Sequence, residues 1–194
     1  MYEGKELLKS EIEKISVAKN LIMNYDKLDL DIFSMLHKGS SFRKSSQWLI
    51  NDYSHPTYLI SFYNSYRLNI VNPTIEKGQK DVPSMYLICH LELNKKIPDS
   101  IIRPATISSK LANLFIHFSI PLSNKPDFNK KYLIGTVNQV ELEQSLSKNL
   151  INLISCDDDL IIEIKNNKCL MMYLHPIKKE DVLELLDLAE EWLA

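Results

Sequence analysis

The sequence predicts an α+β fold in which amphipathic helices pack on a mainly antiparallel sheet. Segments with helical and strand periodicity follow one another without the regular strand–helix alternation of a parallel fold. Near the C-terminus, two apolar segments flank a pair of asparagines, which is the pattern of a tight hairpin. The chain has 194 residues, 45% of them hydrophobic, and a chain of this size can bury roughly 70% of its unfolded surface.

The C-terminal region, residues 132–194, predicts a strand, a helix, a hairpin and a final helix in that order. The short strand covers Tyr132–Ile134. The hairpin strands cover Leu160–Lys165 and Cys169–Leu174. The Asn166–Asn167 pair between them suits a type I′ turn, because asparagine tolerates the positive φ that both central positions need.

Two amphipathic helices flank this hairpin. The first begins after Asn138, whose side-chain oxygen can accept from a free amide of the first turn, and Glu141 can complete a capping box. Val137 and Leu142 are spaced as a hydrophobic staple. The apolar stripe of this helix comprises Leu142, Leu146, Leu150 and Leu153. The stripe of the last helix, which starts near Glu180, comprises Val182, Leu185, Leu186, Ala189, Trp192 and Leu193.

At the N-terminus, Glu3–Tyr25 has the apolar spacing of a long amphipathic helix. Its apolar arc is wide, so one face is expected to be buried, either against its own domain or against a partner. A second, short helix is expected to start at Asp29 or Asp31. These features predict an N-terminal helical element over residues 1–39 and an α+β domain over residues 40–194, packed together as one unit.

The middle of the chain predicts further strands and loops. The clearest strand is Met85–Leu93, whose alternation puts the neighbouring Cys89 and His90 on opposite faces. The other predicted elements are strands over Thr57–Tyr63 and Tyr66–Val71 joined by Asn64 and Ser65, a short helix after Thr106, and a surface loop over Pro121–Lys131.

Cysteine usage and charge limit the expected cellular setting. Cys89, Cys156 and Cys169 form no close pair in the sequence, which favours a reducing compartment. Charges interrupt residues 1–30, so no signal peptide is expected, and no apolar run approaches the ~20 residues of a membrane span. We therefore expect a cytoplasmic protein. A net charge of −2 argues against a broad nucleic-acid surface.

The sequence contains no nucleophile elbow, phosphate-binding loop, dinucleotide fingerprint or zinc-binding motif, so no cofactor is expected. Its histidines do not occur in pairs at helical spacing, and a catalytic or metal site would have to be assembled in three dimensions. The enzyme hypothesis therefore depends on polar residues that converge in the fold, with Cys89, His90 and His117 as its candidate participants.

Two charged segments are candidate sites. Asp157–Asp159 is the densest acidic cluster, but it lacks the ligand spacing of a calcium loop and predicts a solvated turn. The segment 42–48 combines cations with aromatics, so Arg43, Lys44 and Trp48 are candidates for contacts to phosphates and bases. The alternative interpretation of the same segment is a basic connector.

A series of short motifs lies between residues 97 and 135: Ile97-Pro98, Arg103-Pro104, Pro126-Asp127-Phe128 and Tyr132-Leu133-Ile134-Gly135. This series resembles a broad set of bacterial proteins of unknown function, in which Leu-Pro and Arg-Pro precede Pro-Glu-Phe and Tyr-x-Leu-x-Gly. The resemblance covers residues 85–194 and implies a helix, a hairpin and a final helix after the last motif. It implies no activity, and the matched Phe128 and Tyr132 are expected at core and turn positions.

Amphipathic helices at both ends, together with the lack of a reactive motif, favour a non-enzymatic cytoplasmic domain of a regulatory or immunity type. Such a domain would bind a protein partner or self-associate. The alternatives are an enzyme whose site is assembled only in three dimensions and weak nucleic-acid binding around Arg43 and Lys44.

Overall fold

The computed structural model describes residues 3–24, 47–54, 58–65, 84–106 and 119–194. In this part of the chain, eight antiparallel strands form one sheet with the order β1-β2-β3-β4-β8-β7-β5-β6. Helices pack against this sheet, so the predicted α+β class is confirmed.

The elements lie along the chain as follows. The strands are β1 (Ile22–Asn24), β2 (Gln47–Ser54), β3 (Tyr58–Ser65), β4 (Ser84–Glu92), β5 (Ser100–Pro104), β6 (Tyr132–Thr136), β7 (Leu160–Lys165) and β8 (Lys168–Tyr173). The helices are α1 (Glu3–Ala18), α4 (Pro126–Lys131), α5 (Gln139–Ser145), α6 (Lys148–Cys156) and α7 (Lys179–Leu193).

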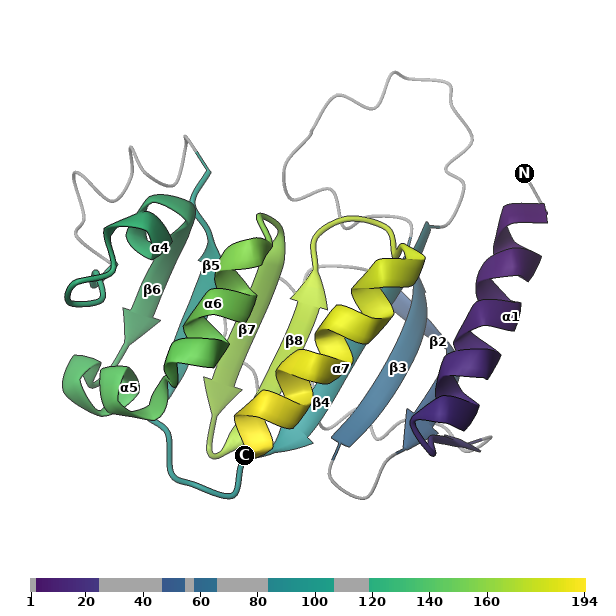
Figure 1. Ribbon diagram of the computed structural model, residues 1–194, viewed down its shortest axis with the longest axis horizontal. Helices are drawn as coiled ribbons and strands as arrows, with labels where there is room; N and C mark the ends of the chain where they lie inside the picture. Colours follow the sequence, from purple (N-terminus) through teal and green to yellow (C-terminus); the bar gives the residue numbers. More distant parts are fainter. Residues whose placement is uncertain (1–2, 25–46, 55–57, 66–83, 107–118) are drawn as a thin grey trace.

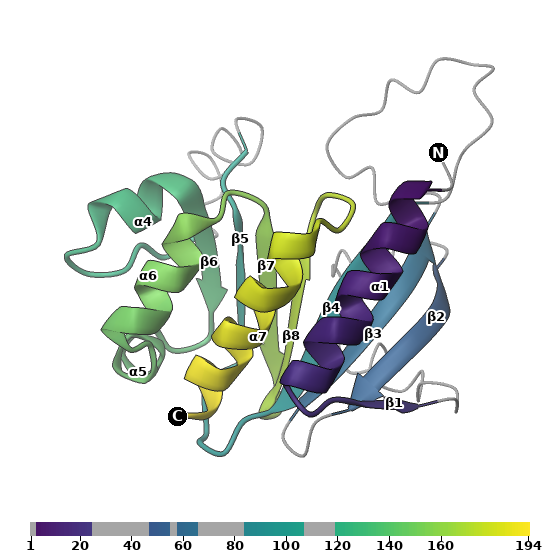
Figure 2. The same cartoon turned by 45° about the vertical axis from the view of Figure 1, so that its right-hand side comes forward.

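Helices α1, α6 and α7 lie side by side on one face of the sheet (Figures 1 and 2). The central helix of this layer is α7, which contacts α1, α6 and β4. Helices α4 and α5 lie at the end of the sheet that β6 forms (Figure 1). The hydrophobic core fills the space between this helical layer and the sheet, and its largest fully buried side chains are Trp192, Tyr132, Tyr173 and Phe128.

The hairpin of β7 and β8 lies near the middle of the sheet. Its residues are buried from Leu160 to Ile164 and from Cys169 to Tyr173, so side chains on both faces of these strands are shielded from solvent. The predicted two-residue turn is confirmed, because Asn166 and Asn167 have φ values of 51° and 64°. Positive φ at both central positions is what a type I′ turn requires.

The predicted helix after Asn138 is present but divided in two. The side chain of Asn138 accepts a hydrogen bond from the amide of Glu141, as expected for an N-cap. The helix ends at Ser145, and Ser147 caps a second helix by accepting from the amide of Leu150 at 3.0 Å. A single helix through Leu153 was therefore a wrong prediction, because a second N-cap residue, Ser147, starts a new helix there.

The break also changes which residues form the apolar stripe. Leu153 is only partly buried, whereas Ile154 is completely buried. The predicted staple does not form, since Val137 is 80% exposed while Leu142 is completely buried. The amide of Asn138 donates to the hydroxyl of Thr136. In the predicted capping box, the side chain of Glu141 would have accepted this hydrogen bond.

The N-terminal helix expected over Glu3–Tyr25 is not supported at that length. Helix α1 ends at Ala18, and Asn20 adopts a positive φ of 53° that turns the chain into β1. Ile12 and Ile15 of α1 belong to the same core as the C-terminal elements. The division into residues 1–39 and 40–194 stays a prediction.

The middle of the chain contains elements that the sequence analysis missed. Strands β2 and β5 were not predicted, and α4 occupies part of the expected loop Pro121–Lys131. Pro126 and Asp127 open α4 with the residue types that favour a helix N-terminus. The predicted turn at Asn64 and Ser65 is wrong, because both residues pair within β3.

Several other predictions fall on parts of the chain that the structure does not describe. These are the helix starting at Asp29 or Asp31, the strand Tyr66–Val71 and the helix after Thr106. The strand predicted over Met85–Leu93 is present as β4 (Ser84–Glu92), with Leu87, Cys89 and Leu91 in the core.

Candidate functional site

Strand β4 separates the thiol and the imidazole that the enzyme hypothesis names. Cys89 is completely buried in the core beneath the helices, and His90 follows it in the same strand and so points to the opposite face. Burial raises the pKa of the Cys89 thiol and lowers the pKa of His90 to about 4. At neutral pH both side chains are therefore uncharged. His117 lies outside the described residues.

The basic segment is only partly described. Arg43 and Lys44 lie outside the described residues, and Trp48 belongs to β2, where its backbone pairs with Asn64. Across the described ranges, no group of three or more His, Cys, Asp or Glu side chains is arranged to hold a metal ion.

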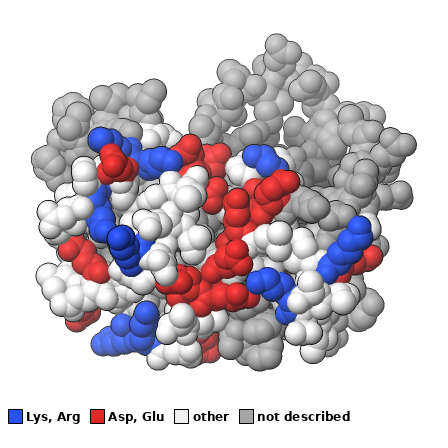
Figure 3. Space-filling view, viewed as in Figure 1, with Lys and Arg blue, Asp and Glu red and all other residues white. Residues whose placement is uncertain are grey.

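The main charged feature of the described surface is a band of carboxylates along α7. Glu180, Glu184, Asp187 and Glu191 follow one another at spacings of four, three and four residues, so they share one helical face. Figure 3 shows acidic side chains running over this helix and on to the turn between α6 and β7. We define the acidic band as Asp157, Asp158, Asp159, Glu180, Glu184, Asp187, Glu190 and Glu191.

Two lysines of the described residues form ion pairs with the acidic band. Lys131 Nζ lies 2.9 Å from Asp158 Oδ1 at one end. Lys19 Nζ lies 3.0 Å from Glu190 Oε1 and 3.5 Å from Asp187 Oδ1 near the other end. The carboxylates of the acidic band outnumber these two lysines.

A hydrogen-bonded cluster around Tyr173 joins the two parts of the acidic band. The Tyr173 hydroxyl donates to Asp157 Oδ2 at 2.8 Å and lies 3.4 Å from Glu184 Oε2. The hydroxyl of Tyr132 donates to the backbone oxygen of Asp157 at 3.0 Å. Two phenols from the sheet thus hold the end of α6 beside the first turns of α7.

Partial burial disfavours the charged form of both carboxylates in this cluster, of which Asp157 is half-buried and Glu184 is more exposed. Burial raises the pKa of Asp157, although the hydrogen bond from Tyr173 acts in the opposite direction. Burial also raises the pKa of Glu184, and the nearby charge of Asp157 adds to the effect. The pKa of Tyr173 is raised by burial and by the negative charge of Asp157. The cluster therefore contains negative charge that further cations near it would stabilise.

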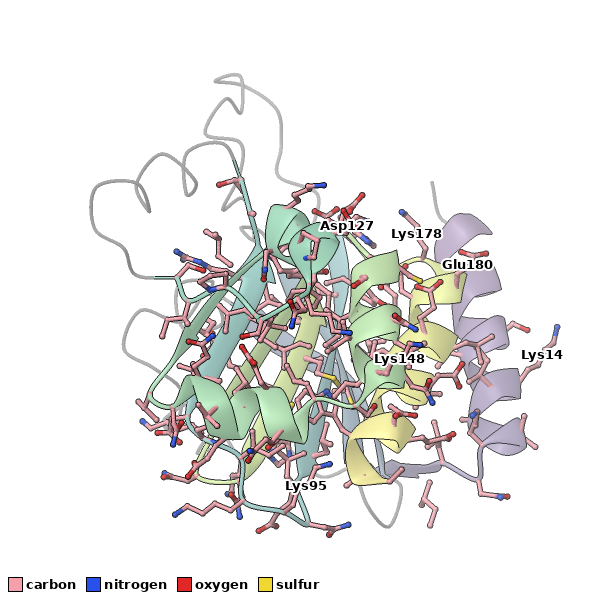
Figure 4. All side chains as sticks on the ribbon, turned by 60° about the vertical axis from the view of Figure 1, so that its left-hand side comes forward. Lys14, Lys95, Asp127, Lys148, Lys178 and Glu180 are labelled. Carbon is pink, nitrogen blue, oxygen red and sulfur yellow. The ribbon has the colours of Figure 1, made fainter. Side chains whose placement is uncertain are left out.

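The first turn of α7 is held by a separate contact. Asp181 is buried and accepts a hydrogen bond from the amide of Lys178 at 2.6 Å, which closes the helix N-terminus. Its other neighbour is His175, whose Nδ1 lies 3.6 Å away and whose ring stacks on Tyr173. In Figure 4, Lys178 and Glu180 lie together at this end of α7, while Lys148 lies on α6.

The sequence analysis identified only a part of this band. Asp157–Asp159 was predicted as a solvated turn, and Asp158 and Asp159 are exposed, but Asp157 is half-buried and bound by Tyr173. The carboxylates of α7 were missed, although their spacing on one helical face is visible in the sequence.

Comparisons with models of known protein families, with curated proteins and with solved structures gave no match. The resemblance stated for residues 85–194 therefore stays a hypothesis. None of the helices in the described residues has both the length and the apolar content needed to cross a bilayer.

Proposed function

We propose that this chain is a non-enzymatic protein-binding domain that holds a basic surface of its partner against the acidic band. The observation that supports this proposal is the excess of carboxylates along α7, which Lys19 and Lys131 offset only in part. A partner that supplies lysine or arginine side chains would complete the pairing.

The physical argument rests on charge and on accessibility. The side chains of Asp187 and Glu190 are 59% and 50% exposed, so a partner can reach them without unfolding any element. Charge of one sign on a helix face steers an oppositely charged protein toward it and increases the association rate. The helix is anchored in the core by the buried side chains of Val182, Leu185 and Trp192.

The proposed cellular setting is the cytoplasm, with a regulatory or immunity-type role in which the partner's basic surface is covered. All three cysteines are free, and Cys156 is exposed. Free thiols are typical of proteins that work in a reducing compartment.

The other hypotheses have less support from the described surface. A carboxylate band repels the phosphates of nucleic acids, so contacts to nucleic acid would need the segment around Arg43 and Lys44. An enzyme would need reactive groups that meet, and Cys89 and His90 point to opposite faces of β4. Self-association through the acidic band would need a basic surface on the second copy.

The proposal can be tested with a fluorescent, lysine-rich helical peptide and a matched peptide in which glutamate replaces every lysine. The full chain is expected to bind only the basic peptide, and binding should weaken between about 0.05 M and about 0.3 M salt because the charges are screened. A band variant with Glu180→Gln, Glu184→Gln and Asp187→Asn should bind roughly tenfold more weakly, since each exposed ion pair contributes about 0.2–1 kcal/mol.

A matched control variant removes three exposed carboxylates outside the acidic band: Glu92→Gln, Asp127→Asn and Glu141→Gln. It changes the net charge by the same amount and should bind the basic peptide as the wild type does, apart from a small long-range effect. Equal losses in the two variants would show that net charge, rather than the acidic band, governs binding. That result, or no binding at all, would contradict the proposal.

A further inference from the structure

Lys19 already occupies one end of the acidic band from within the chain. Its ammonium group lies 3.0 Å from Glu190 Oε1 and 3.5 Å from Asp187 Oδ1. The lysine side chain is 29% exposed, so it is the more shielded member of both pairs. The contact with Glu190 and the attraction of Asp187 raise the pKa of Lys19, which stays positively charged at neutral pH.

The end of α1 holds Lys19 in this position. The amide of Leu21 donates to Ser16 O at 2.7 Å, and Asn20 adopts a positive φ of 53°, as at a helix C-terminus. Ile12 and Ile15 anchor the preceding turns in the core. A cation next to the last carbonyls of a helix is also favoured by the helix dipole. Lys19 is therefore directed at α7 by the fold.

We propose that Lys19 is an internal competitor for the partner's basic side chains, and that its ion pairs with Asp187 and Glu190 reduce the affinity of the acidic band. This inference rests on the proposed function. An incoming lysine or arginine would form the same contacts with the same two carboxylates, so it must displace the Lys19 ammonium group or share the oxygens with it.

The exchange is feasible because exposed ion pairs are weak. A single surface pair of this kind adds little stability, so a partner that brings several cations can replace it. The ion pairs of Lys19 thus lower the affinity of the acidic band for a basic partner, but they do not prevent the partner from binding. It also links α1 to the acidic band through residues 171 positions apart in the sequence.

The test measures binding of the same lysine-rich peptide to a Lys19→Gln variant of the full chain. Removal of the internal cation should tighten binding by roughly twofold to fivefold, which is the factor that one surface ion pair supplies. The matched control is Lys130→Gln, because Lys130 pairs with Asp127 at 2.9 Å on α4. Helices α4 and α1 lie at opposite ends of the molecule (Figure 1), so this variant has the same net charge but an unchanged acidic band.

A double-mutant cycle separates competition from a general charge effect. In a chain that already carries Asp187→Asn and Glu190→Gln, the Lys19→Gln change should no longer tighten binding, because the carboxylates it would release are absent. The thermal midpoint of each variant shows whether it is folded.

The outcomes distinguish the two proposals. Tighter binding by Lys19→Gln alone supports the internal competitor. Equal tightening by Lys130→Gln, or no change with Lys19→Gln while the wild type binds, overturns this inference and leaves the proposed function in place. Failure of both the wild type and Lys19→Gln to bind the basic peptide overturns both.

Discussion

At the scale of single residues, the Tyr173 hydroxyl lies between the carboxylates of Asp157 and Glu184. One phenolic hydroxyl faces two carboxylates, at 2.8 Å and 3.4 Å, and its single hydrogen can satisfy only one of them fully. Burial is the main cause that raises the pKa values of both acids, and the hydrogen bonds from Tyr173 oppose it only in part.

Stability should depend on pH through Glu184. Its pKa is raised above the ordinary 4.5, so the ionised side chain is less favourable in the folded chain than in the unfolded one. This penalty is present at neutral pH and disappears as the pH falls through the folded pKa toward the unfolded value. A Glu184→Gln variant should therefore be more stable than the wild type at pH ~7, by less than about 1 kcal/mol because solvent screens an exposed carboxylate.

Thermal unfolding of the two proteins at a series of pH values measures this effect. The difference in midpoint should shrink as the pH falls from ~7 toward ~4.5. A Glu13→Gln variant, which changes an exposed glutamate of α1, serves as the control. A pH-independent difference, or the same profile for the control, would exclude Glu184 as the source.

At the scale of elements, the division between α5 and α6 shows how a hydroxyl can end one helix and begin another. Leu146 and Ser147 adopt extended backbone conformations, with ψ values of 105° and 158°, between the two helices. The hydroxyl of Ser147 accepts from the amide of Leu150 and donates to Glu191 Oε1 at 2.6 Å. Ser147 thus starts α6 and connects it to the acidic band on α7.

Replacement of this serine should destabilise the chain measurably. Ser147→Ala removes the N-cap of α6, and loss of such a cap costs about 1 kcal/mol. The matched control is Ser145→Ala, because the Ser145 hydroxyl donates to Glu141 O inside α5 and alanine is a better helix former. Chemical denaturation should show a lower free energy of unfolding for Ser147→Ala than for Ser145→Ala. Equal values would mean that the break between the helices does not depend on the cap.

At the scale of the whole molecule, α7 joins the helical layer to the sheet. It contacts α1 on one side and α6 on the other, and its inner face belongs to the core. Leu185 is 1% exposed, whereas Leu183, two residues earlier on the same helix, is 40% exposed. The inner face of the helix stabilises the fold, and the outer face carries the acidic band.

The two faces of α7 therefore predict different losses of stability when a leucine on each face is replaced by alanine. Leu185→Ala should reduce the free energy of unfolding by about 2–5 kcal/mol, because it leaves a cavity in the core. Leu183→Ala should reduce it by less than about 1 kcal/mol, because the side chain keeps much of its contact with water. Denaturant unfolding of both variants gives the comparison. A similar cost for both would show that α7 does not pack on the sheet as described.

The C-terminal region was predictable because its signals are local. Asn166 and Asn167 determine a turn through their own backbone preferences, and the capping side chain of Asn138 lies next to the helix it starts. Strand β5 was missed because it is short and its partners, β6 and β7, lie far along the chain. The end of α1 was predicted too late in the sequence, because the apolar residues after Ala18 continue a helical pattern. In the structure, residues Ile22–Asn24 pair with β2 and form a strand instead.

The sequence by itself determined the local elements of this protein: capped helices, an asparagine turn and apolar stripes, each specified by neighbouring side chains. The tertiary structure decided which charges share one surface. Asp157 meets Glu184, and Lys19 meets Glu190, only when the helices pack on the sheet. The physical reason is that an ion pair or a hydrogen bond acts over a few ångströms, and no local preference specifies which distant residues the fold brings within that distance.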